Sequence, residues 1–261
     1  MALKLHKMGD DRLRRMSVLA YGQPGVGKTS LARSLPVKDW SRFLLVPGDP
    51  GYLSISDLPI ENIFIPYESG SPSELLQWLR DGAADKFDWI FVDGLDKLSE
   101  SVLREFKKAE AKKAKPDMRG MWGDFGDAMG PWIEGMRDLA GPSIVFTCHE
   151  DEDPEADIRI KPAFAGGRVK QALVGMFDYV FYMKLGRTSG KTDGPMERVF
   201  VTQRDATNSR YAAKARMPKG KELDTVVPAD LGAIWTRIFG DDASAKATQK
   251  AGAKAATKGE A

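Results

Sequence analysis

Short apolar runs alternate with amphipathic stretches along most of the chain, and this alternation predicts a mostly parallel sheet flanked by helices. The runs are short and are bounded by glycine, proline or charged residues, as buried strands are. They lie at 17–21, 43–46, 87–93 and 143–147, with a weaker one at 62–66. Helices are predicted between them, at 30–34, 73–80, 98–113 and 132–139.

The later part of the chain has a different pattern. Short runs at 179–184, 198–202 and 211–214 follow one another closely, which predicts strands joined by hairpin connections. From Asp241 onward no large apolar residue occurs, so this segment lacks the surface needed to form a core. We therefore expect one domain over 1–240 and a flexible, alanine- and lysine-rich tail over 241–261.

Composition narrows the class of protein. The chain has 261 residues, enough for one large α/β domain. The net charge is +2, but residues 243–261 carry four lysines against Glu260, a sum of +3 that leaves −1 for the rest. Overall charge therefore gives no argument for nucleic acid. The single Cys148 excludes an intramolecular disulfide, and no apolar run has membrane-spanning length, so we expect a cytoplasmic protein without membrane association.

One motif carries most of the chemistry. Between the strand at 17–21 and the helix at 30–34 the chain reads G-x-x-x-x-G-K-[ST]. Glycines let backbone N–H groups turn inward around phosphates, Lys28 reaches the β- and γ-phosphates, and the Thr29 hydroxyl ligates Mg²⁺. An ordinary glycine-rich turn is the alternative, but both flanks favour the phosphate-binding loop. We predict an ATP and Mg²⁺ site formed by Gly22, Gln23, Pro24, Gly25, Val26, Gly27, Lys28, Thr29 and Ser30.

Two aspartates are candidates for the rest of the site. Asp93 ends the strand at 87–93, where a second group is needed to hold Mg²⁺ with Thr29. The next residue is Gly94, whereas AAA+ ATPases usually have a glutamate there that polarises the attacking water, so the sequence disfavours that class. Asp49, just past the strand at 43–46, could serve as the base instead. Prolines and glycines surround it, so a plain turn residue is an equal alternative.

These segments together resemble a RecA-type core. The motif, the acid after the second strand, Phe91-Val92-Asp93-Gly94-Leu95 and Ile144-Val145-Phe146-Thr147-Cys148-His149 carry the resemblance. More narrowly, the chain is similar over 17–218 to phage-encoded RecA-core ATP-binding proteins of single-strand annealing and recombination. A late lysine-x-arginine element, Lys214-Ala215-Arg216, matches theirs.

The resemblance implies roles for these residues. Asp49 would be the general base, usually glutamate in the family, and the shorter side chain leaves efficient hydrolysis open. His149 would sense the γ-phosphate and pass its state to a DNA-binding loop. Lys214 and Arg216 would act in trans on a neighbour's nucleotide, so a ring or filament with ATP between subunits is expected.

Two segments are candidates for binding single-stranded DNA. The first, 104–125, carries many cations and then glycines interleaved with Trp122 and Phe125, a combination that suits phosphates and bases. The second has an acidic half at 150–157, expected to be a hairpin tip, and a basic half with Arg159, Lys161, Arg168 and Lys170. Solvated helix lysines and core aromatics remain the alternative for the first segment.

The sequence therefore predicts a RecA-like α/β P-loop ATPase, with a mostly parallel central sheet and C-terminal antiparallel strands. Its expected activity is ATP hydrolysis stimulated by single-stranded DNA in phage recombination, annealing or replication, together with single-strand-binding or other replication proteins. A nucleotide-dependent loader without turnover and a small-molecule kinase are the alternatives. The kinase would need an arginine-rich lid, and the basic residues here are scattered.

Overall fold

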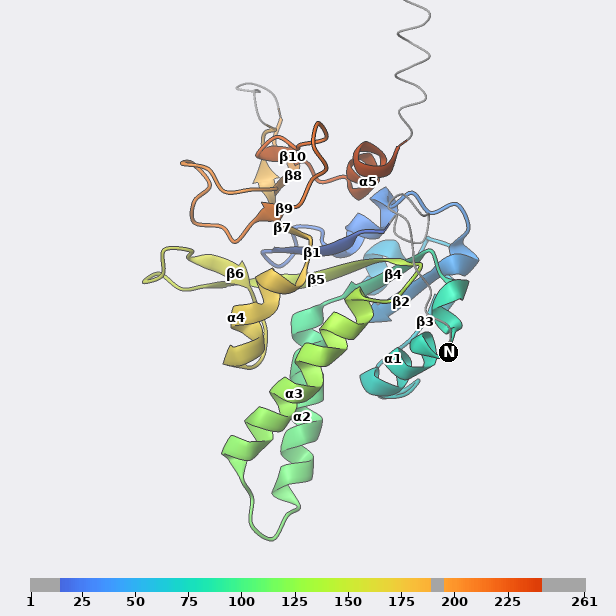
Figure 1. The fold of residues 1–261 in the computed structure, drawn as a ribbon, viewed down its shortest axis with the longest axis vertical. Coiled ribbons are helices and arrows are strands. Elements are labelled where there is room, and N and C mark those ends of the chain that lie inside the picture. Colours follow the sequence, from blue (N-terminus) through green and yellow to red (C-terminus); the bar gives the residue numbers. More distant parts are fainter. Residues whose placement is uncertain (1–14, 189–194, 241–261) are drawn as a thin grey trace, which may run out of the picture.

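A ten-stranded sheet organises the part of the chain that the computed structural model describes, residues 15–188 and 195–240 (Figure 1). Six strands form a parallel centre in the order β7-β1-β5-β4-β2-β3. These are β7 (Tyr179–Gly186), β1 (Ser17–Gly22), β5 (Ser143–Glu152), β4 (Trp89–Asp93), β2 (Phe43–Pro47) and β3 (Asn62–Ile63). The predicted mostly parallel sheet is confirmed, and β5 lies between β1 and β4.

The later strands are antiparallel, as predicted. β8 (Glu197–Val201) pairs with β7, and β10 (Val226–Pro228) pairs with β8. β9 (Lys214–Ala215) pairs with β7, whereas Tyr211, in the strand predicted over 211–214, makes only an isolated bridge to Ile160. β6 (Ile160–Pro162) pairs antiparallel with the end of β5.

Helices cover both faces of the sheet because side chains along its strands alternate between two cores. On β1, Leu19 and Tyr21 belong to one core, while Val18 and Ala20 belong to the other. The first core packs against α1 (Pro72–Arg80), α2 (Leu95–Ala111), α3 (Met118–Arg137) and α4 (Gly167–Met176). The second packs against α5 (Leu231–Phe239) and the 3₁₀ helix η2 (Thr29–Ser34). The segment at 30–34 is thus a 3₁₀ turn rather than an α-helix.

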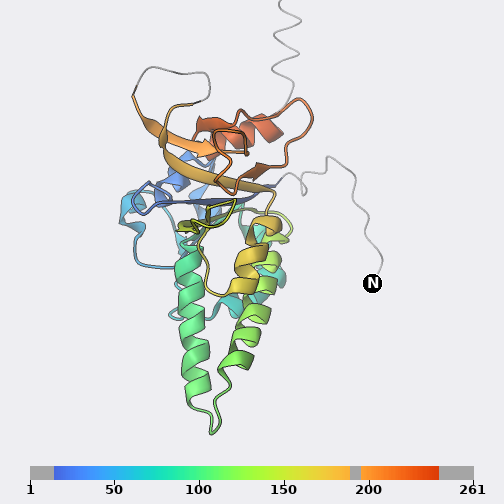
Figure 2. The ribbon, with the colours of Figure 1, turned by 90° about the vertical axis from the view of Figure 1, so that its left-hand side faces the viewer.

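Helices α2 and α3 form a hairpin that extends away from the sheet, and we call it the helical arm (Figures 1 and 2). The sequence predicted a helix over 132–139, and α3 contains most of it but begins 14 residues earlier, at Met118, where no helix was predicted. Met121, Phe125, Met129 and Ile133 are buried and recur every four residues, so one face of α3 packs despite its glycines. Asp117 caps the helix by accepting a hydrogen bond from the Gly120 N–H.

Three smaller 3₁₀ turns complete the described structure, η3 (Trp40–Arg42), η4 (Tyr52–Ile55) and η5 (Ala83–Lys86). Within residues 15–188 and 195–240, no helix is both long enough and apolar enough to cross a bilayer. The tail predicted over 241–261 lies outside the described residues, so the division of the chain at 240 stays a prediction.

Candidate nucleotide site

The phosphate-binding motif lies where the topology places the end of β1, between β5 and β7. Gly22 pairs with His149 on one side and with Met183 on the other. A β-carbon on Gly22 would lie 2.3 Å from the Met183 carbonyl oxygen, so only glycine fits between these strands. Gly27 has a φ of 100°, in the left-handed region that favours glycine. The backbone of the motif therefore has the local geometry that a phosphate-binding loop needs.

Lys28 is buried inside this loop. Its Nζ donates to the carbonyl oxygens of Gly22, at 2.9 Å, and Gln23, at 2.8 Å. Burial lowers the pKa of the Lys28 ammonium, and the neighbouring carboxylates of Asp96 and Asp93 oppose that shift. The ammonium is thus held at the centre of the loop, where a polyphosphate would replace the two carbonyls as its partner.

Asp93 lies beside the motif, as predicted. The Thr29 hydroxyl donates to Asp93 Oδ2 at 2.7 Å, and the Thr147 hydroxyl donates to Asp93 Oδ1 at 2.5 Å. The Gly94 N–H in turn donates to the Thr147 oxygen at 2.9 Å. Because β5 lies between β1 and β4, its Thr147 lies next to Asp93 at the end of β4, on the side toward the phosphate-binding loop. Burial raises the pKa of Asp93, while hydrogen bonds from Thr147 and Thr29 lower it.

These oxygen atoms suit Mg²⁺. A hydroxyl and a carboxylate, both hard ligands, meet next to the phosphate-binding loop, and Mg²⁺ typically takes one or two carboxylates plus substrate phosphates. Among the described residues there is no cluster of three or more His, Cys, Asp and Glu side chains that would form an all-protein metal site. Thr29 and Asp93 therefore fit a metal shared with nucleotide phosphates.

Asp49 lies at the same edge of the sheet. The Gly48 N–H donates to the Asp93 carbonyl at 2.6 Å, and the charge of Asp49 is one of the influences that raise the Asp93 pKa. Asp49 is exposed, and its Oδ1 accepts a hydrogen bond from the Gly51 N–H at 2.8 Å. It thus occupies a turn and also lies near the site, so the structure is compatible with both roles that the sequence left open.

His149 is fixed beside the start of the loop by a residue that sequence reasoning missed. Its Nδ1 lies 2.7 Å from Oδ2 of Asp96, and its backbone N–H donates to Oδ1 of the same carboxylate at 3.2 Å. Asp96 is buried, in the first turn of α2, three residues after Asp93. Two signals could have pointed to these residues: the three-residue spacing for Asp96, and a hydroxyl directly after the apolar residues 144–146 for Thr147.

Lys214 and Arg216 lie at the opposite end of the strands, away from their own loop. Lys214 pairs with Val180, whereas Gly22 pairs with Met183, about 10 Å further along β7. Arg216 forms an ion pair with Asp178 at 3.0 Å, and Lys214 Nζ lies 3.4 Å from the Gly175 carbonyl. Burial, and then the charge of Arg216, lowers the Lys214 pKa.

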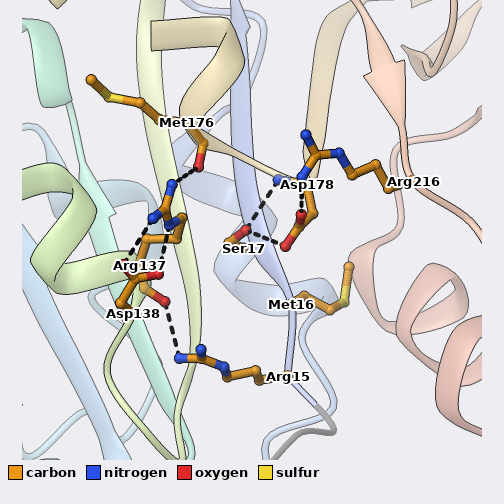
Figure 3. A pocket seen from close by; sticks show the side chains of 8 residues that line it. All are labelled: Arg15, Met16, Ser17, Arg137, Asp138, Met176, Asp178 and Arg216. Atoms are coloured by element: carbon orange, nitrogen blue, oxygen red, sulfur yellow. Dashed lines mark hydrogen bonds and ion pairs between the residues drawn. The ribbon is translucent and has the colours of Figure 1, made fainter. Parts of the chain in front are cut away.

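Arg216 lines a polar pocket of about 300 Å³ at this end of the sheet (Figure 3). Ser17 donates to Asp178 at 2.9 Å, and Arg137 donates to the Met176 carbonyl at 2.8 Å. Arg15 donates to the Arg137 carbonyl at 3.1 Å. The structure therefore does not bring Lys214 and Arg216 to their own phosphate-binding loop, so any contact they make with nucleotide must involve another subunit's loop.

The first nucleic-acid candidate lies on the helical arm. Its cationic residues are all exposed: Arg104, Lys107, Lys108, Lys112, Lys113, Lys115 and Arg119. Trp122 is 41% exposed and Lys107 Nζ lies 5.7 Å from its ring centre, whereas Phe125 is fully buried. The predicted DNA-binding segment is therefore the surface of a helix pair, and Phe125 belongs to the core.

The second candidate segment includes the predicted acidic hairpin. The hairpin itself is confirmed. β5 and β6 pair from Glu150 opposite Pro162 to Glu152 opposite Ile160. Two residues of the basic half are already paired with acids: Lys170 with Asp151, and Arg168 with Asp127 on the arm at 2.9 Å. These pairs reduce the positive charge available to a nucleic acid at this position.

Comparison with known proteins bears on the class of protein. Residues 14–217 match a protein family described as an AAA domain. Our expectation that Gly94 disfavours an AAA-type ATPase is therefore wrong. No curated protein matches the sequence.

Among solved structures, one similar fold is a prototypical ATPase from the type III secretion system of pathogenic bacteria. It shares 12% identity with this chain at a TM-score of 0.40, and the match covers 65% of this chain. The match spans only 52% of that ATPase, about half its length.

Proposed function

This chain belongs to the AAA domain family of P-loop ATPases, and from that premise we propose that it hydrolyses Mg-ATP between subunits and couples hydrolysis to single-stranded DNA. One observation supports the nucleotide part above all. Thr29, at the end of the phosphate-binding loop, and Asp93, at the end of β4, are joined by a 2.7 Å hydrogen bond. This is the arrangement that a metal-bound triphosphate requires of a P-loop enzyme.

Each residue of the loop has a task in this proposal. The backbone N–H groups of the loop, which all its residues except Pro24 possess, surround the phosphates. Lys28 exchanges its two carbonyl partners for phosphate oxygens. Thr29 and Asp93 would hold Mg²⁺, which would supply positive charge to the phosphate oxygens. Thr147 keeps the Asp93 carboxylate oriented toward Thr29 through its 2.5 Å hydrogen bond.

The attacking water needs a carboxylate or another acceptor near the γ-phosphate. We assign this role to Asp49, which follows β2 at the edge shared with Asp93, and its side chain must then release the Gly51 N–H. His149 reports the state of the phosphate, because Asp96 fixes its ring beside Gly22 and its chain continues into the acidic hairpin.

Catalysis in this proposal needs a second subunit. Lys214 and Arg216 lie at the end of the sheet opposite the loop, so a head-to-tail arrangement brings them to a neighbour's γ-phosphate. There they offset negative charge in the transition state. A ring or filament follows from such an arrangement, and Arg216 leaves Asp178 when the interface forms.

Single-stranded DNA is assigned to the helical arm. Its exposed lysines suit a phosphate backbone, and Trp122 offers a ring on which a base can stack. The resemblance to phage recombination proteins supports this choice and supports a role in annealing or replication with single-strand-binding proteins. The arm is favoured over the hairpin because the hairpin's acids repel phosphates.

A loader or scaffold that binds ATP without turnover is the second candidate. The hydrogen bond between Asp49 and the Gly51 N–H favours it, since a carboxylate committed to a turn is poorly placed to activate water.

The test is the ATPase rate of the full chain and of residues 1–240, each with and without single-stranded DNA. The Lys28→Ala variant of each provides the background rate. Stimulation that survives removal of the tail supports the proposal. A rate equal to that of Lys28→Ala under all conditions, with Mg-ATP still bound, supports the loader.

A further inference from the structure

A cationic cleft adjoins the phosphate-binding loop on the side of β7 and β8. It has a volume of about 500 Å³ and is lined by Gln23 to Val26 of the loop and by the ends of the two strands. Its charged lining residues are Lys184, Arg198 and Arg210, and the described residues that line it include no carboxylate. The cleft is therefore suited to an anion that also contacts the loop.

Arg198 is the residue of this cleft that touches the loop. On β8 it pairs with Leu185 of β7, two residues beyond the position that faces Gly22. A β-carbon on Gly27 would lie 2.7 Å from Arg198 Cζ and 2.8 Å from its Nε, so the guanidinium packs directly on the Gly27 backbone. Gly27 is thus required for this contact as well as for its φ of 100°.

The other two cations of the cleft are engaged with Tyr211. Lys184 Nζ lies 5.0 Å from the ring centre and 3.3 Å from Asn208 Oδ1. Arg210 Nη2 donates to the Tyr211 hydroxyl at 2.6 Å. The exposed Arg198 side chain, by contrast, forms no hydrogen bond or ion pair within residues 15–188 and 195–240. It is the cation at the loop whose donors are available to a ligand.

We propose that Arg198 acts in cis as a phosphate-binding residue of the nucleotide site, closing the loop from the side of β8. This inference rests on the proposed function. A guanidinium presents several N–H donors in a plane and so matches two oxygens of a phosphate group. Lys28 then contacts the triphosphate from inside the loop and Arg198 from outside it, while Lys214 and Arg216 belong to the neighbouring subunit.

The experiment measures binding of Mg-ATP and of inorganic tripolyphosphate to the full-length protein, the second ligand isolating phosphate contacts from base contacts. The variants are Arg198→Ala and Arg198→Lys, with Lys28→Ala as a loop control and Arg80→Ala, an exposed arginine on α1, as a matched control. Thermal unfolding of each variant verifies that it is folded.

A charge-assisted hydrogen bond of this kind corresponds to a loss of about ten- to a hundredfold in affinity. We expect Arg198→Ala to lose that factor for both ligands, Arg198→Lys to regain part of it, and Arg80→Ala to match the wild type. Unchanged or tighter binding by Arg198→Ala overturns the inference, as does weaker ATP binding with unchanged tripolyphosphate binding. If the wild type binds no Mg-ATP, or Lys28→Ala binds it normally, the proposed function fails too.

Discussion

The Thr29 hydroxyl lies 2.7 Å from Oδ2 of Asp93, a residue 64 positions further along the chain. The two residues are far apart in the sequence, and β1 and β4 are not neighbouring strands in the sheet. The two meet because parallel strands end at the same edge and because β5, between them, contributes Thr147. The predictions that follow depend on this arrangement.

Replacing Lys28 with alanine tests the loop itself. The ammonium is the only side-chain cation found inside the loop in the described structure, so Lys28→Ala is expected to weaken Mg-ATP binding by at least about a hundredfold. The measurement is equilibrium binding of a fluorescent ATP analogue. Lys38→Ala, at an exposed position past η2, is the control and should bind like the wild type. Normal affinity in Lys28→Ala would remove the site assignment.

Asp93 makes stability depend on pH in the absence of nucleotide and Mg²⁺. Burial raises the pKa of Asp93 above its ordinary value of 3.8. At a pH between the ordinary pKa and the raised pKa, the folded protein binds a proton that the unfolded chain does not. The free energy of unfolding contributed by Asp93 therefore falls as pH rises through that window.

Asp93→Asn should abolish this contribution and raise the melting temperature at neutral pH, while Mg-ATP binding is lost. Thermal melts of both proteins across the pH range provide the measurement. A lower melting temperature for Asp93→Asn at neutral pH would mean that the hydrogen bonds from Thr29 and Thr147 outweigh burial.

The trans role of Lys214 and Arg216 can be tested by mixing inactive variants. A double variant, Lys214→Ala with Arg216→Ala, keeps its own loop, and Lys28→Ala keeps the two cations. We expect each alone to lose about a hundredfold or more in turnover, and a mixture of the two to regain measurable ATPase activity, because some interfaces then contain an intact loop and intact cations. A mixture no more active than its components would contradict action between subunits.

Substituting Trp122 and Phe125 one at a time distinguishes an aromatic residue that binds DNA from one that packs in the core of the helical arm. Phe125 is fully buried, so Phe125→Ala should cost about 3–5 kcal/mol of unfolding free energy. Trp122 is 41% exposed, so Trp122→Ala should cost less stability than Phe125→Ala and weaken single-stranded DNA binding about tenfold. Thermal melts and fluorescence anisotropy with a labelled oligonucleotide measure the two effects. Unaltered DNA affinity in Trp122→Ala would exclude the stacking contact.

Salt dependence tests the cations of the same surface. If the arm's lysines contact phosphates, the affinity for single-stranded DNA falls steeply with salt, and replacing Lys112 and Lys115 with alanine lowers the slope by about one or more units. The chain ending at Gly240 serves as the background, because it lacks the lysines of the tail. A slope that disappears with the tail and is indifferent to the arm would place the contact in residues 241–261.

Local chemistry was readable from the sequence alone. The order of residue types was enough to predict the phosphate-binding loop with its glycines and Lys28. It was also enough to predict the apolar runs that form β1, β2, β4 and β5, and the carboxylate at the end of β4. Such features depend on steric freedom, side-chain period and burial over a few residues, and these are properties of a short segment. The glycines of α3, by contrast, concealed a long helix, because tertiary packing of its apolar face outweighed their weak helix propensity.

Only the tertiary structure decided which distant residues meet. Asp96 pairs with His149, Thr147 connects Thr29 to Asp93, and Arg198 packs on Gly27. In each case the residues in contact are 53 or more positions apart in the chain. Strand order determines these contacts, and strand order is the outcome of packing over the whole chain rather than of any local pattern. The same strand order placed Lys214 and Arg216 at the end of the sheet opposite the phosphate-binding loop. The spacing of these two residues in the sequence does not predict their distance from the loop.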